Sequence, residues 1–188
     1  MCIMCITLEY SICNYAGIYR GIECKGLKED SITFESWNGL VNQTRWAIDY
    51  AAKQWNNRTG RTKLCHSPTQ HGNNIQSQRD GHNRITKVAF AADDDAAMTT
   101  HLWGENINGY TYVIEADIMI NSNLPWNNTG SVNHYDVQNC LTHELGHMLG
   151  LGHALNPEPT MYYICEIGKT KKRTIEQEDL EGFFNLYS

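Results

Sequence analysis

The sequence THELGHMLGLGH, residues 142–153, contains three histidines whose spacing suits one metal ion. His143 and His147 are four residues apart, so on an α-helix both imidazoles lie on one face, a turn apart. Gly150 follows, and glycine can end a helix in the left-handed conformation at little cost, which lets His153 return to the same ion. Three neutral imidazoles leave the fourth position of a tetrahedral zinc ion open, as in catalytic sites.

Glu144 places a carboxylate directly beside the first of these histidines. A zinc ion lowers the pKa of its bound water to about 7, and a nearby carboxylate can take that proton and pass it to a leaving amine. The short pattern H-E-x-x-H can arise from incidental surface histidines on a helix. The longer pattern H-E-x-x-H-x-x-G-x-x-H also fixes the turn and the third ligand, and it therefore predicts a catalytic zinc site with Glu144 as general base.

The segment from His143 to His153 resembles the zinc-binding signature of the metzincin metallopeptidases. Metzincins have a methionine-containing turn beneath the metal, and the sequence PTMYY at residues 159–163 resembles that turn. Met161 follows His153 by eight residues, the short connection typical of matrixins. Astacins, adamalysins and serralysins have Glu, Asp or Pro after the third histidine, whereas this chain has Ala154. The best match is a matrixin-like minimal catalytic domain.

The resemblance implies an α+β metzincin fold with a twisted, mostly parallel five-stranded sheet, a long backing helix, the zinc helix and a C-terminal helix. Residue patterns agree with this order. Alternation and β-branched or aromatic residues predict strands over 31–36, 84–91, 99–103 and 110–121. A 3.6-residue period predicts a helix over 42–58.

The sequence also predicts where two helices begin and where the catalytic domain starts. Asp136 suits the start of the zinc helix, and Thr174-Ile175-Glu176-Gln177 reads as a capping box that opens the last helix. The basic run over 169–173 is expected to be an exposed loop. We expect residues 1–30 to form a loosely structured lead-in or pro-segment remnant, and residues 31–188 to form the catalytic domain.

Composition limits the classes of function. The chain has 188 residues, which suits one domain, and its formal net charge of −6 argues against nucleic-acid binding. No apolar run is long enough to span a membrane. The apolar first eight residues lack a basic region and a clear cleavage site, so they make a poor signal peptide. The family resemblance nevertheless implies a secreted or extracellular protein, and we expect a monomer.

Two further metal sites are conceivable. Residues 60–83 are polar and contain Cys65, His66, His71 and His82, but the H-x-D segment with which matrixins begin a structural zinc site is absent, so surface histidines are favoured. The acids Asp93, Asp94 and Asp95 could bind calcium, although a solvated turn is the favoured interpretation and calcium has no further support.

The sequence predicts a zinc-dependent endopeptidase that binds a protein or peptide substrate in extended form along a sheet edge, around 99–103. The alternative is a catalytically inactive zinc-binding interaction protein on the same scaffold. Tyr163 is a second catalytic candidate, because in astacins and serralysins a tyrosine two residues after the methionine can hydrogen-bond the tetrahedral intermediate. It could equally form only the wall of the substrate pocket.

The chain has seven cysteines, so at least one has no partner within the chain. Cys140 precedes His143 by one helical turn, and Cys165 lies four residues after Met161. The methionine turn of the resembled family packs beneath the zinc helix, which would bring these two cysteines together. We therefore expect a Cys140–Cys165 disulfide, provided that the Cα atoms lie within about 7 Å.

Overall fold

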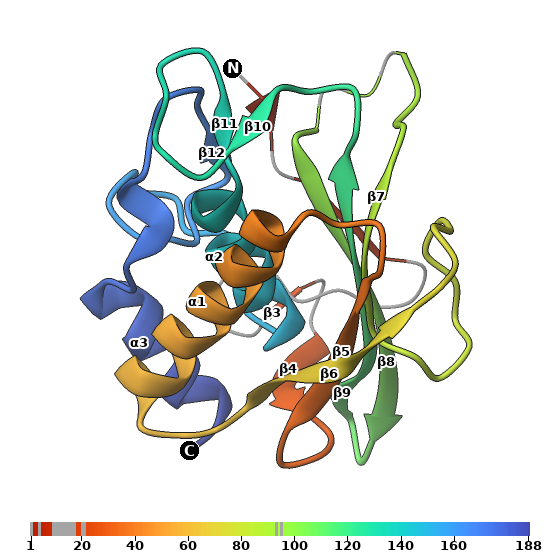
Figure 1. Cartoon of the computed structure of the whole chain (residues 1–188). Helices are drawn as coiled ribbons and strands as arrows, with labels where there is room; N and C mark the ends of the chain where they lie inside the picture. Colours follow the sequence, from red (N-terminus) through yellow and green to blue (C-terminus); the bar gives the residue numbers. More distant parts are fainter. Residues whose placement is uncertain (1, 4, 9–17, 20–21, 93, 95) are drawn as a thin grey trace.

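The computed structural model describes residues 2–3, 5–8, 18–19, 22–92, 94 and 96–188 (Figure 1), with side chains described from residue 25 onward. Three helices lie together on one side of a twisted sheet (Figure 1). They are α1 (Asn42–Thr59), α2 (Val137–Met148) and α3 (Gln177–Leu186). The α+β metzincin architecture expected from the sequence is therefore confirmed.

Five strands form the centre of the sheet, in the spatial order β6-β5-β7-β9-β8. All neighbours pair in parallel except β8, which runs antiparallel to β9. Their bounds are β5 (Ile32–Trp37), β6 (Leu64–His71), β7 (Arg84–Val88), β8 (Met98–Ile107) and β9 (Tyr110–Asn121). Four of them are the predicted strands, with β8 extending four residues beyond the predicted end. The fifth, β6, lies in the polar segment 60–83, for which no strand was predicted.

Strands from the first 30 residues extend this sheet. β2 (Cys5–Leu8) pairs in parallel with the outer edge of β8, and β4 (Ile22–Leu27) pairs in parallel with β9. β3 (Ile18–Tyr19) pairs with β4, and β1 (Cys2–Ile3) pairs with β12 (Ile164–Cys165) just after the methionine turn. The division of the chain near residue 30 stays a prediction. Two short strands, β10 (Trp126–Asn127) and β11 (Tyr135–Asp136), lead into α2.

The hydrophobic core fills the space between the helices and the sheet. Phe34 and Ile118 from the sheet, Ile48 and Trp55 from α1, and Leu141 from α2 are at most 1% exposed. The indole of Trp55 also donates to the carbonyl of Thr142 (2.7 Å), which ties α1 to the helix that carries the histidines. α1 ends at Gly60, whose φ of 68° is readily adopted only by glycine. The burial of α2 and its hydrogen bond to Trp55 therefore fix the position of this helix.

The start of α3 differs from the prediction. Glu176 is the N-cap, and its capping partner is Asp179, so the box begins two residues after Thr174. The carboxylate of Asp179 also accepts the backbone N–H groups of Thr160 (2.9 Å) and Met161 (3.0 Å). These long-range bonds explain why the capping box lies later in the chain than predicted, because Asp179 must lie in the first turn of α3 to reach the methionine turn. Within the described part of the chain, no helix has the length and apolar character needed to cross a membrane.

Candidate metal centre

The helix that carries the candidate ligands begins at Asp136, as predicted. The Asp136 carboxylate accepts the backbone N–H of Asn139 (2.9 Å) and thus caps α2. It is fully buried, and the Arg173 guanidinium donates to both of its oxygens. Arg173 belongs to the basic run that was expected to be exposed; instead it compensates a buried carboxylate.

α2 ends where His153 has to turn back toward the helix. Gly150 has a φ of 91° and donates its N–H to the carbonyl of His147 (2.7 Å), while Leu151 donates to the carbonyl of Gly146 (3.0 Å). This pair of bonds is the Schellman arrangement, in which a left-handed glycine closes a helix. The chain reverses here, and His153 approaches the two histidines of α2.

Backbone carbonyls orient the two helical imidazoles. Nδ1 of His143 lies 2.7 Å from the carbonyl oxygen of Thr160, and Nδ1 of His147 lies 2.7 Å from that of Leu151. A carbonyl only accepts hydrogen bonds, so each Nδ1 carries the proton and each Nε2 carries a lone pair. This arrangement of an outer hydrogen bond and an inner lone pair is typical of histidines that bind a metal.

The three Nε2 atoms converge. That of His147 lies 2.9 Å from that of His143 and 3.1 Å from that of His153. Tetrahedral zinc with bonds of about 2.0–2.1 Å places its ligand nitrogens roughly 3.3 Å apart. Within the described part of the chain, this is the one group of three or more His, Cys, Asp or Glu side chains close enough to hold a metal ion. The predicted set His143, His147 and His153 is thus brought together, and its donors suit zinc.

The imidazoles of this cluster are held neutral. Burial, the largest cause, lowers the pKa of His143 and His147 well below the usual value, and burial lowers that of His153 to about 4. The nearby Lys172 ammonium acts in the same direction on each of them. Neutral histidine is the form that binds metal, so the cluster is ready to coordinate an ion at neutral pH.

Glu144 lies on α2 between the two helical histidines and is fully buried. Its Oε2 accepts a hydrogen bond from the hydroxyl of Thr100 on β8 (2.5 Å), whereas its Oε1 has no hydrogen-bond partner among the described residues. Burial raises the pKa of this carboxyl to about 8, against the opposing effect of Thr100. A buried carboxylate with one oxygen fixed and one unoccupied suits a group that exchanges protons with a substrate or a water molecule.

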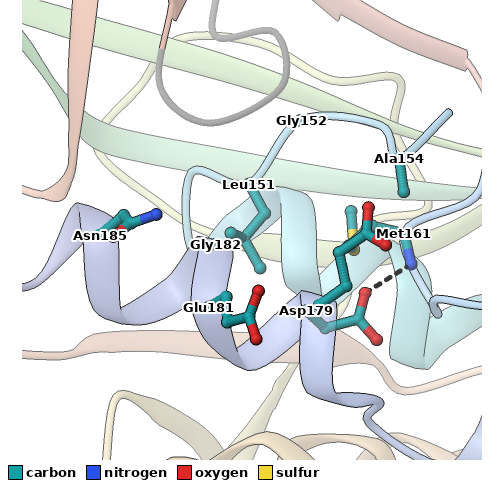
Figure 2. A pocket seen from close by; sticks show the side chains of 9 residues that line it. Leu151, Gly152, Ala154, Met161, Asp179, Glu181, Gly182 and Asn185 are labelled. Carbon is teal, nitrogen blue, oxygen red and sulfur yellow. Dashed lines mark hydrogen bonds between the residues drawn. The ribbon is translucent and has the colours of Figure 1, made fainter.

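The predicted methionine turn packs against α2. Met161 is 3% exposed, and its sulfur lies beside Gly146, the helical residue that precedes His147. On its other side the turn borders a pocket of about 190 Å³ that α3 helps to line (Figure 2). Figure 2 shows Asp179 of α3 directed at the backbone of Met161, to which it is hydrogen-bonded. Met161 thus supports the helix by packing, in the place expected for it.

Two tyrosines follow the methionine. The ring of Tyr163 lies 6.2 Å from that of His153 and 4.8 Å from that of Tyr162, measured between centroids. Lys172 was expected to be exposed but is buried, and its ammonium donates to the carbonyl of Tyr162 and lies 3.2 Å from Nδ1 of His143. The sequence pattern does not predict a buried Lys172, because a lysine among charged neighbours normally stays in water.

The other candidate residues lie apart from this centre. His66 bridges Asp49 of α1 (2.7 Å) and Ser36 of β5 (3.1 Å), so its ring joins a helix to the sheet. His71 contacts the carbonyl of Asn73 (2.8 Å). Of the three acids considered for calcium, Asp93 and Asp95 lie outside the described residues.

Comparison with known proteins agrees with this geometry. The matrixin family model matches residues 31–188, and the chain therefore belongs to the matrixin family. A 46-residue segment is 41% identical to human matrilysin and covers 24% of this chain. A 53-residue segment is 36% identical to metalloendoproteinase 1 of Glycine max and covers 28% of this chain. Each matched segment spans 17% of the relative's length.

Proposed function

We propose that the protein is a zinc-dependent endopeptidase that hydrolyses peptide bonds of proteins. The observation that carries this proposal is the convergence of three neutral imidazole nitrogens, two of them from the helix that also carries a buried carboxyl group, one oxygen of which has no hydrogen-bond partner in the described part of the chain. His143, His147 and His153 would hold the ion, and membership of the matrixin family supports zinc as that ion. When bound, zinc supplies a water of lowered pKa and an electrophile for the scissile carbonyl.

Glu144 performs the proton transfers. Its Oε1 is free to accept a proton from the attacking water and to deliver it to the leaving nitrogen. Thr100 holds the other oxygen, so the carboxylate keeps one orientation through both transfers. The role of Tyr163 is a hydrogen bond to the developing oxyanion, which the position of its ring near that of His153 permits.

The substrate binds in extended form along β8. In the structure, residues 5–8 pair with that edge in parallel, so a substrate strand has to displace them. We assign one substrate side chain to a pocket of about 260 Å³ that Asn139, Tyr162, Ile164 and Lys172 help to line, because Lys172 also contacts His143. The same family membership supports action on proteins outside the cell.

A peptidase assay with matched variants tests the proposal. Glu144→Gln should abolish hydrolysis of a broad-specificity peptide substrate and retain bound zinc, because the ligands stay intact. His153→Ala should lose both activity and zinc affinity, and a chelator should inactivate the wild type reversibly. The rival function, a zinc-binding protein without catalysis, predicts a wild type that binds zinc and hydrolyses no peptide, and that result would overturn the proposal.

A further inference from the structure

Cys140 and Cys165 lie in direct contact behind the metal centre. Their sulfur atoms are 2.7 Å apart, with both residues present as thiols, and the two residues are 0% and 1% exposed. The side-chain amide of Asn139 contacts the Cys165 sulfur at 3.7 Å. A disulfide bond measures about 2.05 Å, so a small movement of the two side chains suffices to form one.

The two cysteines flank the metal-binding segment in the sequence. Cys140 lies on α2, one turn before His143, and Cys165 lies on β12, four residues after Met161. The 25-residue separation between the two cysteines encloses all three histidines, Glu144 and the methionine turn. A bond between the sulfurs would close the whole metal-binding segment into one covalent ring.

We propose that Cys140 and Cys165 form a disulfide that closes the metal-binding segment and slows the loss of its ion. The bond forms by exchange with a small disulfide such as oxidised glutathione. The thiolate of one of the two cysteines attacks one glutathione sulfur and releases one glutathione thiolate, and the thiolate of the other cysteine then attacks the first cysteine's sulfur and releases the second. The two cysteines lose two protons and two electrons, and one glutathione disulfide becomes two glutathione thiols.

Burial decides when this exchange can take place. Because both sulfurs are closed off in the folded chain, exchange takes place while the segment folds or opens locally. The same burial then protects the finished bond from reductants.

Mass spectrometry tests the bond itself. The full chain is equilibrated with oxidised glutathione, its remaining thiols are alkylated in denaturant, and it is cleaved after glutamate, because Glu144 separates the two cysteines and no lysine or arginine does. We expect a linked pair of peptides, two hydrogens lighter than the separate ones, and the same link in Cys65→Ser. Alkylation of both cysteines, or a bond from Cys165 to any other cysteine, would overturn the proposal.

Zinc release tests the consequence. The oxidised and the reduced wild type are each loaded with zinc and mixed with a chromogenic chelator. The oxidised form should release its ion at least about fivefold more slowly, because opening a closed loop of this length gains less chain entropy. Equal rates would overturn the coupling to the metal centre. Both measurements are independent of peptidase activity, so their failure is distinguishable from failure of the proposed function.

Discussion

Gly146 of α2 lies so close to Met161 that a Cβ atom at position 146 would overlap the methionine sulfur. The same atom would lie 2.8 Å from Cζ2 of Trp55. The helix that carries His143 and His147 is therefore fitted between α1 and the methionine turn with no room for a methyl group. Gly150, the glycine of the H-E-x-x-H-x-x-G-x-x-H pattern, is required for its backbone conformation, whereas Gly146 is required for its small size.

Gly146→Ala should therefore lower the free energy of unfolding of the zinc-bound protein by about 1–3 kcal/mol, because an overpacked core costs more than alanine gains in helix propensity. Gly72→Ala is the matched control, since a Cβ there meets nothing within 4 Å. Urea unfolding of both variants measures the difference. Equal stability of the two variants would contradict the close fit at Met161.

Thr100 should be needed for catalysis but not for zinc binding. Thr100→Val removes the one side-chain hydrogen bond that orients the Glu144 carboxyl group, and losing an ordinary hydrogen bond costs about 0.5–1.5 kcal/mol. We expect kcat/KM to fall up to about tenfold with zinc content unchanged. Thr86→Val is the control, because the Thr86 hydroxyl is buried and has no hydrogen-bond partner among the described residues. Similar activity of both variants would argue against positioning by Thr100.

Asp117 should make stability depend on pH. Its buried carboxylate accepts the backbone N–H groups of Gln78 (3.2 Å) and Arg84 (2.8 Å), yet burial dominates and raises its pKa to about 6. Because the pKa is higher in the folded than in the unfolded chain, its stabilising contribution is present at pH 4 and is lost as pH rises through 6.

Asp117→Asn removes this titration alone. Between pH 7 and pH 4 the free energy of unfolding of the wild type should rise relative to that of the variant, by about 2–3 kcal/mol. Urea unfolding at four pH values gives both curves, and the histidines contribute equally to each. Parallel curves would mean that Asp117 keeps the same protonation state in the folded and unfolded chain.

The geometry of the candidate metal centre could be predicted from sequence because its information is local. The spacing of His143 and His147, the glycine break and the N-cap Asp136 each act within one or two turns of helix. Elements that depend on distant contacts were harder to predict. β6 contains Pro68 and is mostly polar, which an edge strand tolerates; among the described strands it pairs with β5 alone.

Single residues that depend on distant partners were equally hard to predict, as Lys172, Arg173 and Asp179 show. Lysine and arginine in a charged run predict an exposed surface, but here Lys172 meets the carbonyl of Tyr162 and Arg173 meets a buried Asp136. The start of α3 follows from Asp179 reaching the backbone of Met161, eighteen residues earlier in the chain. No local pattern reports such partners, and a single sequence does not reveal them.

Residues 1–8 should reduce activity. β2 covers the edge of β8 along which the substrate is proposed to bind. Only the fraction of protein molecules in which residues 5–8 have left this edge can therefore bind substrate. Deleting residues 1–8 should raise kcat/KM several-fold, and a synthetic peptide of this sequence should inhibit the shortened protein competitively. Unchanged kcat/KM together with no inhibition would place the substrate elsewhere.

Tyr163→Phe decides between the two roles of Tyr163. The ring stays and only the hydroxyl is lost, so packing against Tyr162 and the position near His153 should be unchanged. If the hydroxyl donates to the oxyanion, kcat should fall by about 10²–10³, the cost of losing one such donor, with KM and zinc content unchanged. Tyr162→Phe is the control, since it removes the neighbouring hydroxyl. A kcat within about twofold of the wild type would leave Tyr163 as part of the pocket wall, and Glu144 would then be the one catalytic side chain of this proposal.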